Sequence, residues 1–92
     1  MRFQNKKLSI IIPVFNEEET IEKIVKLVFE ANVLGLEKQI IVVDDGSTDS
    51  TKGILTELKD RFNLILVNLG KNQGKGAAIR AGLEYANGDL VV

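Results

Sequence analysis

Four short apolar runs alternate with three longer amphipathic segments along this chain of 92 residues, and this order restricts the fold more than any other feature of the sequence. The runs are rich in β-branched residues and nearly unbroken, which is typical of strands buried on both faces of a sheet. They cover residues 8–12, 40–43, 64–67 and 90–92. Between them, apolar residues recur at helical spacing in three groups: Ile21, Ile24, Val25, Val28 and Ala31; Ile54, Leu55, Leu58 and Phe62; and Ala78, Ala81, Gly82 and Ala86.

This alternation predicts a single α/β domain over residues 1–92. Crossover connections between parallel strands are right-handed, and they place the connecting helices on the faces of the sheet. We therefore expect a Rossmann-like parallel sheet of about four strands, in the order β-α-β-α-β-α-β, with helices on both faces. No loop follows the fourth run, so we expect the chain to be truncated there and to be the N-terminal part of a longer domain.

Composition removes several kinds of chemistry and several classes of partner. The sequence has no cysteine and no histidine, so disulfides, thiolate zinc sites and imidazole acid–base catalysis are excluded within it. Its 12 basic and 13 acidic residues are well mixed and give a net charge of −1, which does not favour nucleic acid as a partner. Residues 1–7 are polar and lack the apolar core of a signal peptide, and the apolar run 8–14 is too short to span a bilayer. We therefore expect a cytoplasmic location.

The loop after the first run is acidic. Ligands bind at the carboxyl ends of the strands in open α/β sheets, so the loops at these ends carry the functional information. Asn16 is a good N-cap for the next helix, and Glu19 is placed to complete a capping box. Glutamates 17–19 favour the positive end of a helix and repel phosphate, so this loop suits ribose hydroxyls or a base edge. Two interpretations of Phe15 remain open, packing on a base and filling the core.

The loop after the second run begins with two adjacent aspartates, Asp44 and Asp45. Side chains alternate along a strand, so one carboxylate is expected to point back to the sheet edge and the other over the ligand cleft. Gly46 permits a sharp turn, and Ser47 or Asp49 is suited to cap the next helix. Capping does not account for the aspartate pair. We therefore interpret Asp45 as an acceptor for a base N–H or a ribose hydroxyl.

The loop after the third run is glycine-rich and basic. Lys71 and Lys75 alternate with Gly70, Gly74 and Gly76, and no acidic residue lies nearby. Glycines let backbone N–H groups approach an anion, and the start of the next helix is suited to hold it. Two interpretations remain open here, a cradle for a diphosphate and a solvated basic turn. The spacing matches neither a Walker A motif nor a dinucleotide fingerprint, so classical NAD binding is not expected.

Four motifs follow one another at the ends of these runs. They are Ile12-Pro13-Val14-Phe15-Asn16-Glu17-Glu18, then Val42-Val43-Asp44-Asp45-Gly46-Ser47-Thr48-Asp49, then Asn72-Gln73-Gly74-Lys75-Gly76-Ala77-Ala78, and finally Asn87-Gly88-Asp89. In this order and spacing they resemble the N-terminal motifs of family 2, GT-A-type glycosyltransferases. The variety that they resemble most is the polyprenyl- or dolichyl-phosphate hexose transferases, and the resemblance covers essentially all of residues 8–92.

The resemblance implies a domain that binds a nucleotide-diphosphate sugar. It implies that Pro13, Phe15 and Glu17 line the nucleotide pocket. Asp45 would bond the base with support from Asp44, and Lys75 with its neighbouring amides would lie near the diphosphate. The candidate binding residues are therefore Pro13, Phe15, Asn16, Glu17, Asp44, Asp45, Gly46, Ser47, Lys75 and Gly76.

The same resemblance implies that metal binding and catalysis need residues outside this sequence. Members of the family carry an Asp-x-Asp motif shortly after the fourth strand, which binds Mg²⁺ or Mn²⁺ across the diphosphate, and a catalytic base farther on. We expect the parent protein to transfer a hexose from a donor of the GDP-mannose or UDP-glucose type to an acceptor. That acceptor would be a lipid such as polyprenyl phosphate, on the cytosolic face of a membrane. The 92-residue chain alone would hold no metal, bind nucleotide weakly and be inactive.

Other functions account less well for the loops. A phosphoacceptor receiver domain pairs aspartates after the first strand and places a lone aspartate after the third, where this chain has Asn68. A nucleotidyltransferase carries a glycine-rich, arginine-containing loop after the first strand, where this chain has residues 13–18. A nucleotidyltransferase or a non-catalytic nucleotide-binding module remains the alternative.

Overall fold

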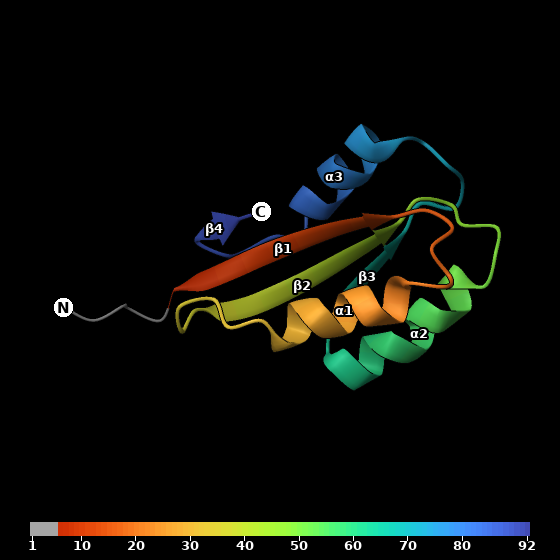
Figure 1. Cartoon of the computed structure of the whole chain (residues 1–92). Helices are drawn as coiled ribbons and strands as arrows, with labels where there is room; N and C mark the ends of the chain where they lie inside the picture. Colours follow the sequence, from red (N-terminus) through yellow and green to blue (C-terminus); the bar gives the residue numbers. More distant parts are fainter. Residues whose placement is uncertain (1–5) are drawn as a thin grey trace.

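The four expected strands form one parallel sheet in the computed structural model, which describes residues 6–92 (Figure 1). In chain order the elements are β1 (Lys7–Val14), α1 (Ile21–Glu30), β2 (Glu37–Asp44), α2 (Thr51–Phe62), β3 (Ile65–Asn68), α3 (Lys75–Leu83) and β4 (Leu90–Val91). The predicted element order and the Rossmann-like arrangement are confirmed. Of residues 1–7, on which the expectation about a signal peptide depends, residues 1–5 lie outside the described part of the chain.

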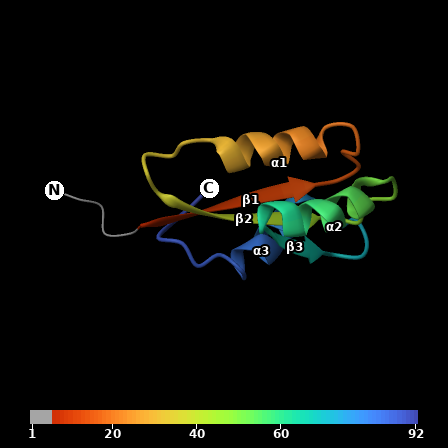
Figure 2. The same cartoon turned by 90° about the horizontal axis from the view of Figure 1, so that it is seen from below.

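The strands lie in the order β3-β2-β1-β4 and run in the same direction. Figure 1 labels all four strands, and Figure 2 shows β1, β2 and β3 from below. β1 and β2 pair over their whole length, and this pairing ends with Val14 opposite Asp44. β2 and β3 pair up to Asp44 opposite Asn68. Three strands therefore end in one row, and the loops that follow them leave the same edge of the sheet.

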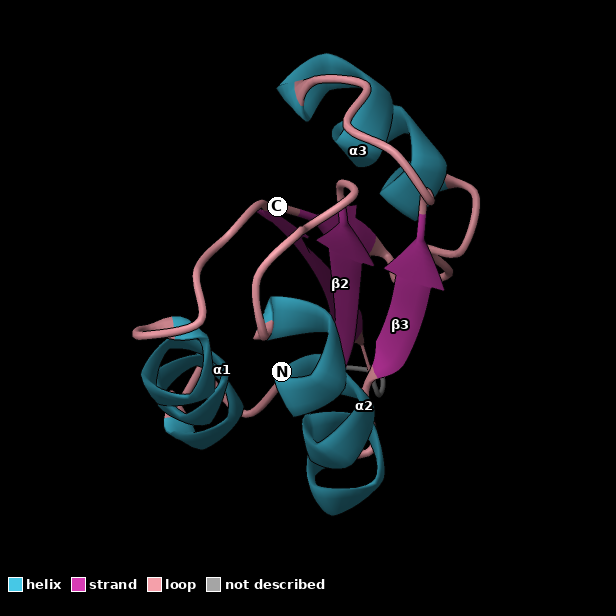
Figure 3. Ribbon diagram, turned by 90° about the vertical axis from the view of Figure 1, so that its right-hand side faces the viewer, coloured by secondary structure: helices cyan, strands magenta, loops and turns pink. Residues whose placement is uncertain are grey.

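Helices cover both faces of this sheet (Figure 3). α1 and α2 pack on one face over the larger core cluster, whose buried members are Val14, Ile21, Val25, Ile40, Val42, Leu55, Leu58 and Leu64. α3 packs on the other face, where its buried Ala78 meets Ile41 and Val43 of β2. Alternate residues of β2 thus serve opposite clusters, which is why its run of apolar residues is unbroken. No helix within residues 6–92 is both long enough and apolar enough to cross a membrane.

Two apolar segments are more exposed than the sequence pattern predicts. The exposed fractions in and after β4 are 52% for Leu90, 43% for Val91 and 70% for Val92. The reason is that β4 is a two-residue strand at the edge of the sheet, beside β1. On α1 the buried stripe is narrower than expected, because Ile24 is 37% exposed and Ala31 lies beyond the last helical residue.

The first helix also begins later than predicted. Asn16 was expected as its N-cap with Glu19 as the capping-box partner, but α1 starts at Ile21 and Thr20 occupies the N-cap position. Asn16 instead has a φ of 52°, in the left-handed region, and its side chain bonds to the loop after β2. The amides of Thr20 and Ile21 donate to the carbonyl of Glu17 at 3.1 and 2.8 Å. Residues between Asn16 and α1 therefore form a turn and belong to the loop.

Candidate functional site

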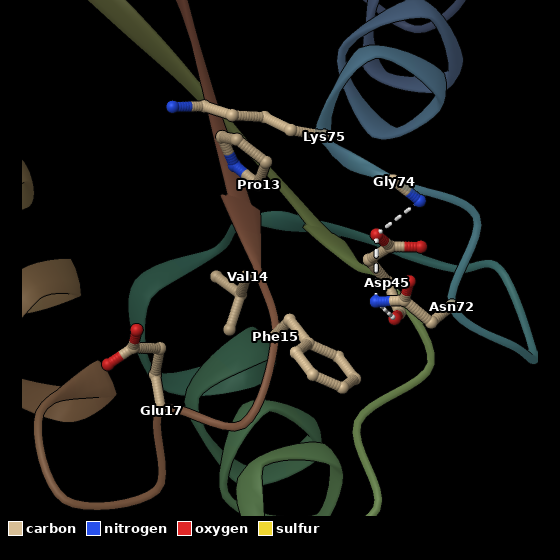
Figure 4. Close-up of a pocket in the computed structure, with 8 residues that line it drawn as sticks. All are labelled: Pro13, Val14, Phe15, Glu17, Asp45, Asn72, Gly74 and Lys75. Atoms are coloured by element: carbon tan, nitrogen blue, oxygen red, sulfur yellow. Dashed lines mark hydrogen bonds between the residues drawn. The ribbon is translucent and has the colours of Figure 1, made fainter.

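An open pocket lies at the carboxyl edge of the sheet, between the end of β1, the loops after β1, β2 and β3, and the start of α3 (Figure 4). Its volume is about 320 Å³, which is within the range of small-molecule sites. It is lined by Pro13, Val14, Phe15, Glu17, Asp45, Asn72, Gly74 and Lys75. Asp45 follows β2 and Lys75 begins α3, so two segments far apart in the sequence contribute to one cavity, as the sequence predicts.

The pocket separates the ten candidate residues into two groups. Five of them line it, namely Pro13, Phe15, Glu17, Asp45 and Lys75. The other five lie outside the lining, namely Asn16, Asp44, Gly46, Ser47 and Gly76. Val14, Asn72 and Gly74 line the pocket but were not among the candidates. Asn72 and Gly74 belong to the third of the four motifs, but no local pattern in the sequence indicates that they bond to Asp45 and line the pocket.

The loop after β1 gives the pocket an aromatic wall and a carboxylate (Figure 4). The side chain of Phe15 is 44% exposed, so it does not fill the core. The amide of Glu17 donates to Thr51 Oγ1 at 2.8 Å, and its Oε2 accepts from Thr20 Oγ1 at 2.8 Å. These bonds restrict the glutamate at both its backbone and its side chain. This side of the pocket therefore offers an apolar surface and an acceptor for hydrogen-bond donors.

Asp45 is buried, with 4% of its surface exposed, and its carboxylate is held by the loop after β3. Its Oδ1 accepts from the amide of Gln73 at 2.7 Å, and its Oδ2 accepts from the amide of Gly74 at 2.9 Å and from Asn72 Nδ2 at 3.3 Å. Figure 4 shows the contacts with Asn72 and Gly74. No pattern in the sequence indicates these bonds. A carboxylate has about four acceptor positions, so roughly one remains for a ligand.

The sequence neighbours of Asp45 stabilise the turn after β2 and do not line the pocket. Asp44 is 2% exposed, and its Oδ1 accepts from the amide of Ser47 at 3.1 Å. Ser47 does not cap α2, because its Oγ accepts from the amide of Asn16 at 2.9 Å. The cap expected from Asp49 is present in part, since its Oδ1 accepts from the amide of Thr51, the first residue of α2, at 2.9 Å. Burial raises the pKa of Asp49, but hydrogen bonds from the side chain and amide of Thr51 and from the backbone of Glu18 and of Asp49 itself together outweigh it, so the pKa lies below its ordinary value.

Asn16 joins the first loop to the second. Its Oδ1 accepts from the amides of Thr48 and Asp49 at 2.8 and 3.3 Å, and its backbone amide donates to Ser47. Asparagine tolerates the left-handed backbone conformation better than most residues. Asn16 is preceded by Phe15 and followed by Glu17, so these bonds fix two residues of the pocket wall.

The loop after β3 brings a positive charge to the opposite side of the pocket. Lys75 is the first residue of α3, and no ion pair within residues 6–92 involves it. The first amides of a helix lack intrahelical partners and favour an anion. The amides of Gln73 and Gly74 donate to Asp45, so the glycine-rich loop is not an open cradle. The part of the loop that suits an anion is the start of α3 with Lys75.

The described residues do not fit the divalent cation that the resemblance implies. Within residues 6–92, no three acidic side chains gather as a set of metal ligands. Asp44 and Asp45 are adjacent in sequence, but each accepts hydrogen bonds from loop amides. The described residues therefore offer no set of ligands for this cation.

Comparison with known proteins places the chain in a family. Residues 9–92 match the model of Glycosyl transferase family 2. Among solved structures, the mannosyltransferase PcManGT from Pyrobaculum calidifontis, in complex with GDP-Man and Mn²⁺, is 27% identical with a TM-score of 0.84 over 95% of this chain. S. aureus TarS 1-349 in complex with UDP-GlcNAc is 31% identical with a TM-score of 0.81 over 94%. Glucosyl-3-phosphoglycerate synthase from Mycobacterium tuberculosis, in complex with Mn²⁺, UDP and glucosyl-3-phosphoglycerate, is 30% identical with a TM-score of 0.67 over 94%.

The likeness covers nearly the whole of this chain but a smaller share of each of these structures. The chain spans 26% of PcManGT, 25% of TarS 1-349 and 32% of the synthase. The family match extends over both the strand ends and the three loops that form the pocket. The chain belongs to glycosyl transferase family 2 and has the Rossmann-like GT-A fold.

Proposed function

We propose that the pocket binds the nucleoside diphosphate part of a nucleotide sugar. The observation that supports this most strongly is that Asp45 and Lys75 line one cavity with Phe15 and Glu17. Phe15 offers a flat apolar surface to a base, and the carboxylates of Glu17 and Asp45 accept from base N–H groups or ribose hydroxyls. Lys75 and the start of α3 attract the diphosphate. The pocket thus has a nucleoside side and a phosphate side.

We propose that the whole protein transfers a hexose from such a donor to an acceptor. The donor would be of the GDP-mannose or UDP-glucose type, in line with the nucleotide sugars and nucleotides named for the similar structures. The acceptor would be a polyprenyl phosphate, with transfer on the cytosolic face of a membrane. That acceptor rests on the resemblance of the loop motifs to polyprenyl- and dolichyl-phosphate hexose transferases.

Transfer also needs neutralisation of the charge that develops on the leaving diphosphate. We propose that Mg²⁺ or Mn²⁺ does this in the whole protein, since two of the similar structures contain Mn²⁺ with a nucleotide or nucleotide sugar. The ligands would come from residues outside this chain. We accordingly propose that the 92-residue chain binds nucleotide but does not catalyse transfer.

Calorimetric titration of the chain with UDP, GDP and the corresponding nucleosides tests the binding proposal. Without metal we expect a Kd of roughly 0.1–1 mM for the diphosphates. The affinity should be this weak because a single side-chain cation, Lys75, supplies most of the contact with the phosphates. Lys75→Ala should weaken diphosphate binding by about five- to tenfold and leave nucleoside binding nearly unchanged. Lys52→Ala, which removes an exposed lysine on α2, is the matched control and should have no effect.

Three results would contradict this proposal or a part of it. If neither nucleoside nor diphosphate binds at millimolar concentrations, the pocket is not a nucleotide site. If Lys75→Ala and Lys52→Ala weaken diphosphate binding equally, Lys75 has no specific role. A micromolar Kd without metal would contradict the expectation of weak binding.

A further inference from the structure

The segment that leads into α3 has one main hydrogen-bonding partner, Asp45, which accepts through its carboxylate and its backbone carbonyl. The amide of Leu69 still follows the sheet and donates to the carbonyl of Asp44 at 3.0 Å. The carbonyl of Gly74 already belongs to α3 and accepts from Ala78. Within residues 6–92, the hydrogen bonds made by residues 70–73 between these two points all end on Asp45.

These bonds also explain how a carboxylate is tolerated at a nearly buried position. An unpaired buried charge is costly, whereas hydrogen bonds from backbone amides stabilise it. Asp45 receives two such bonds from consecutive amides, those of Gln73 and Gly74, and a third from the side chain of Asn72. The carboxylate and the segment therefore depend on each other.

The residue after this segment is Lys75, which lines the same pocket. Gly74 has a φ of 100°, a backbone conformation that glycine adopts far more readily than other residues. The bond from its amide to Asp45 restrains the chain immediately before the lysine. Asp45 thus lines the pocket with its own side chain and holds the backbone that leads to Lys75.

We propose that Asp45 is a positioning residue that holds residues 72–74 so that Lys75 and the start of α3 meet the phosphates of the ligand. This inference rests on the proposed function and adds a second role for a side chain otherwise assigned to the nucleoside. It makes a specific claim about affinity: Asp45 contributes to the gain in binding that the phosphates provide.

Asp45→Asn separates the two roles. The asparagine keeps the size of the side chain but replaces one acceptor oxygen with an NH₂ group that faces an amide donor. We expect the ratio of the uridine Kd to the UDP Kd to fall from about five- to tenfold in the unaltered chain to about twofold or less. The same fall is expected for Lys75→Ala, and the double variant should lose little more, because both changes remove one coupled contribution.

An equal loss of affinity for uridine and UDP in Asp45→Asn would overturn the inference, because it would indicate a contact with the nucleoside alone. Additive losses in the double variant would overturn it too. If Asp45→Asn does not fold, Asn72→Ala tests the same point. It removes one of the three donors and should lower the ratio by about twofold.

A measurement without ligand distinguishes failure of this inference from failure of the proposed function. In the unaltered chain, the amide protons of Gln73 and Gly74 should exchange slowly with solvent, since both donate to a buried carboxylate. They should exchange at least about tenfold faster in Asp45→Asn. Asp44→Asn is the matched control, because Asp44 is equally buried but accepts from Ser47 instead, and it should leave both protons protected. Unchanged protection in Asp45→Asn would overturn the inference whether or not nucleotide binds.

Discussion

Replacing Gly46 with alanine is expected to lower the free energy of unfolding by about 2–5 kcal/mol, a large part of the stability of a chain of this length. Two effects add. Gly46 has a φ of 73°, a conformation that costs other residues about 1–2 kcal/mol. A Cβ atom at this position would also collide with the backbone of the loop after β3, with Lys71 Cα at 2.6 Å and with Lys71 C and Asn72 N closer still. Backbone atoms cannot move aside as a flexible side chain can.

Gly70→Ala is the matched control for this experiment. Gly70 also has a positive φ, of 86°, but a Cβ there would meet no atom within 4 Å. We expect a loss of about 1–2 kcal/mol from backbone conformation alone. Urea denaturation followed by circular dichroism measures both variants. If Gly46→Ala were no less stable than Gly70→Ala, the close approach of the second and third loops would be wrong.

The second large effect is expected for Gly82→Val in α3. A Cβ at this position would lie 2.7 Å from Ile11 Cγ2 and 3.2 Å from Val43 Cγ2, so the glycine lets the helix pack closely on β1 and β2. Valine should push α3 away from the sheet and lower the free energy of unfolding by about 2–3 kcal/mol, as overpacked cores do. Because α3 carries Lys75, nucleotide binding should weaken as well.

The matched control for Gly82→Val is Gly53→Ala in α2. A Cβ at Gly53 would meet no atom within 4 Å, so alanine should raise stability by about 0.5–1 kcal/mol through helix propensity. The same urea denaturation applies. A Gly82→Val protein as stable as the unaltered chain would contradict the close packing of α3 on the sheet.

The sequence predicts the elements of this fold well because each follows a local period. The unbroken run Ile40–Val43 reflects burial on both faces of β2, and the spacing of Leu55 and Leu58 reflects the buried side of α2. Parallel topology then brings the strand ends together, and so the shared pocket of Asp45 and Lys75 follows from the order of the elements alone. Edge position is not a local property, which is why the exposure of β4 was missed.

Details of the site were missed because they depend on contacts between loops. Asn16 is of a residue type that is common at N-caps. Its conformation is determined instead by hydrogen bonds with Thr48 and Asp49, which lie more than thirty positions away in the sequence. Asp45 was interpreted as an acceptor for ligand, while most of its acceptor positions are taken by Asn72, Gln73 and Gly74. No period in the sequence indicates which loop amide meets which carboxylate.

The central claim is that the first three strand ends form one nucleotide pocket. NMR titration of the isotope-labelled chain with UDP tests it most directly. We expect the amide signals of Phe15, Asp45, Gly74 and Lys75 to shift together along one binding curve. The signals of Lys38 and Phe62, which line a separate cavity of about 290 Å³ beside the start of β2, should stay in place. Shifts confined to Lys38 and Phe62, or shifts at Asp45 without Lys75, would contradict the claim.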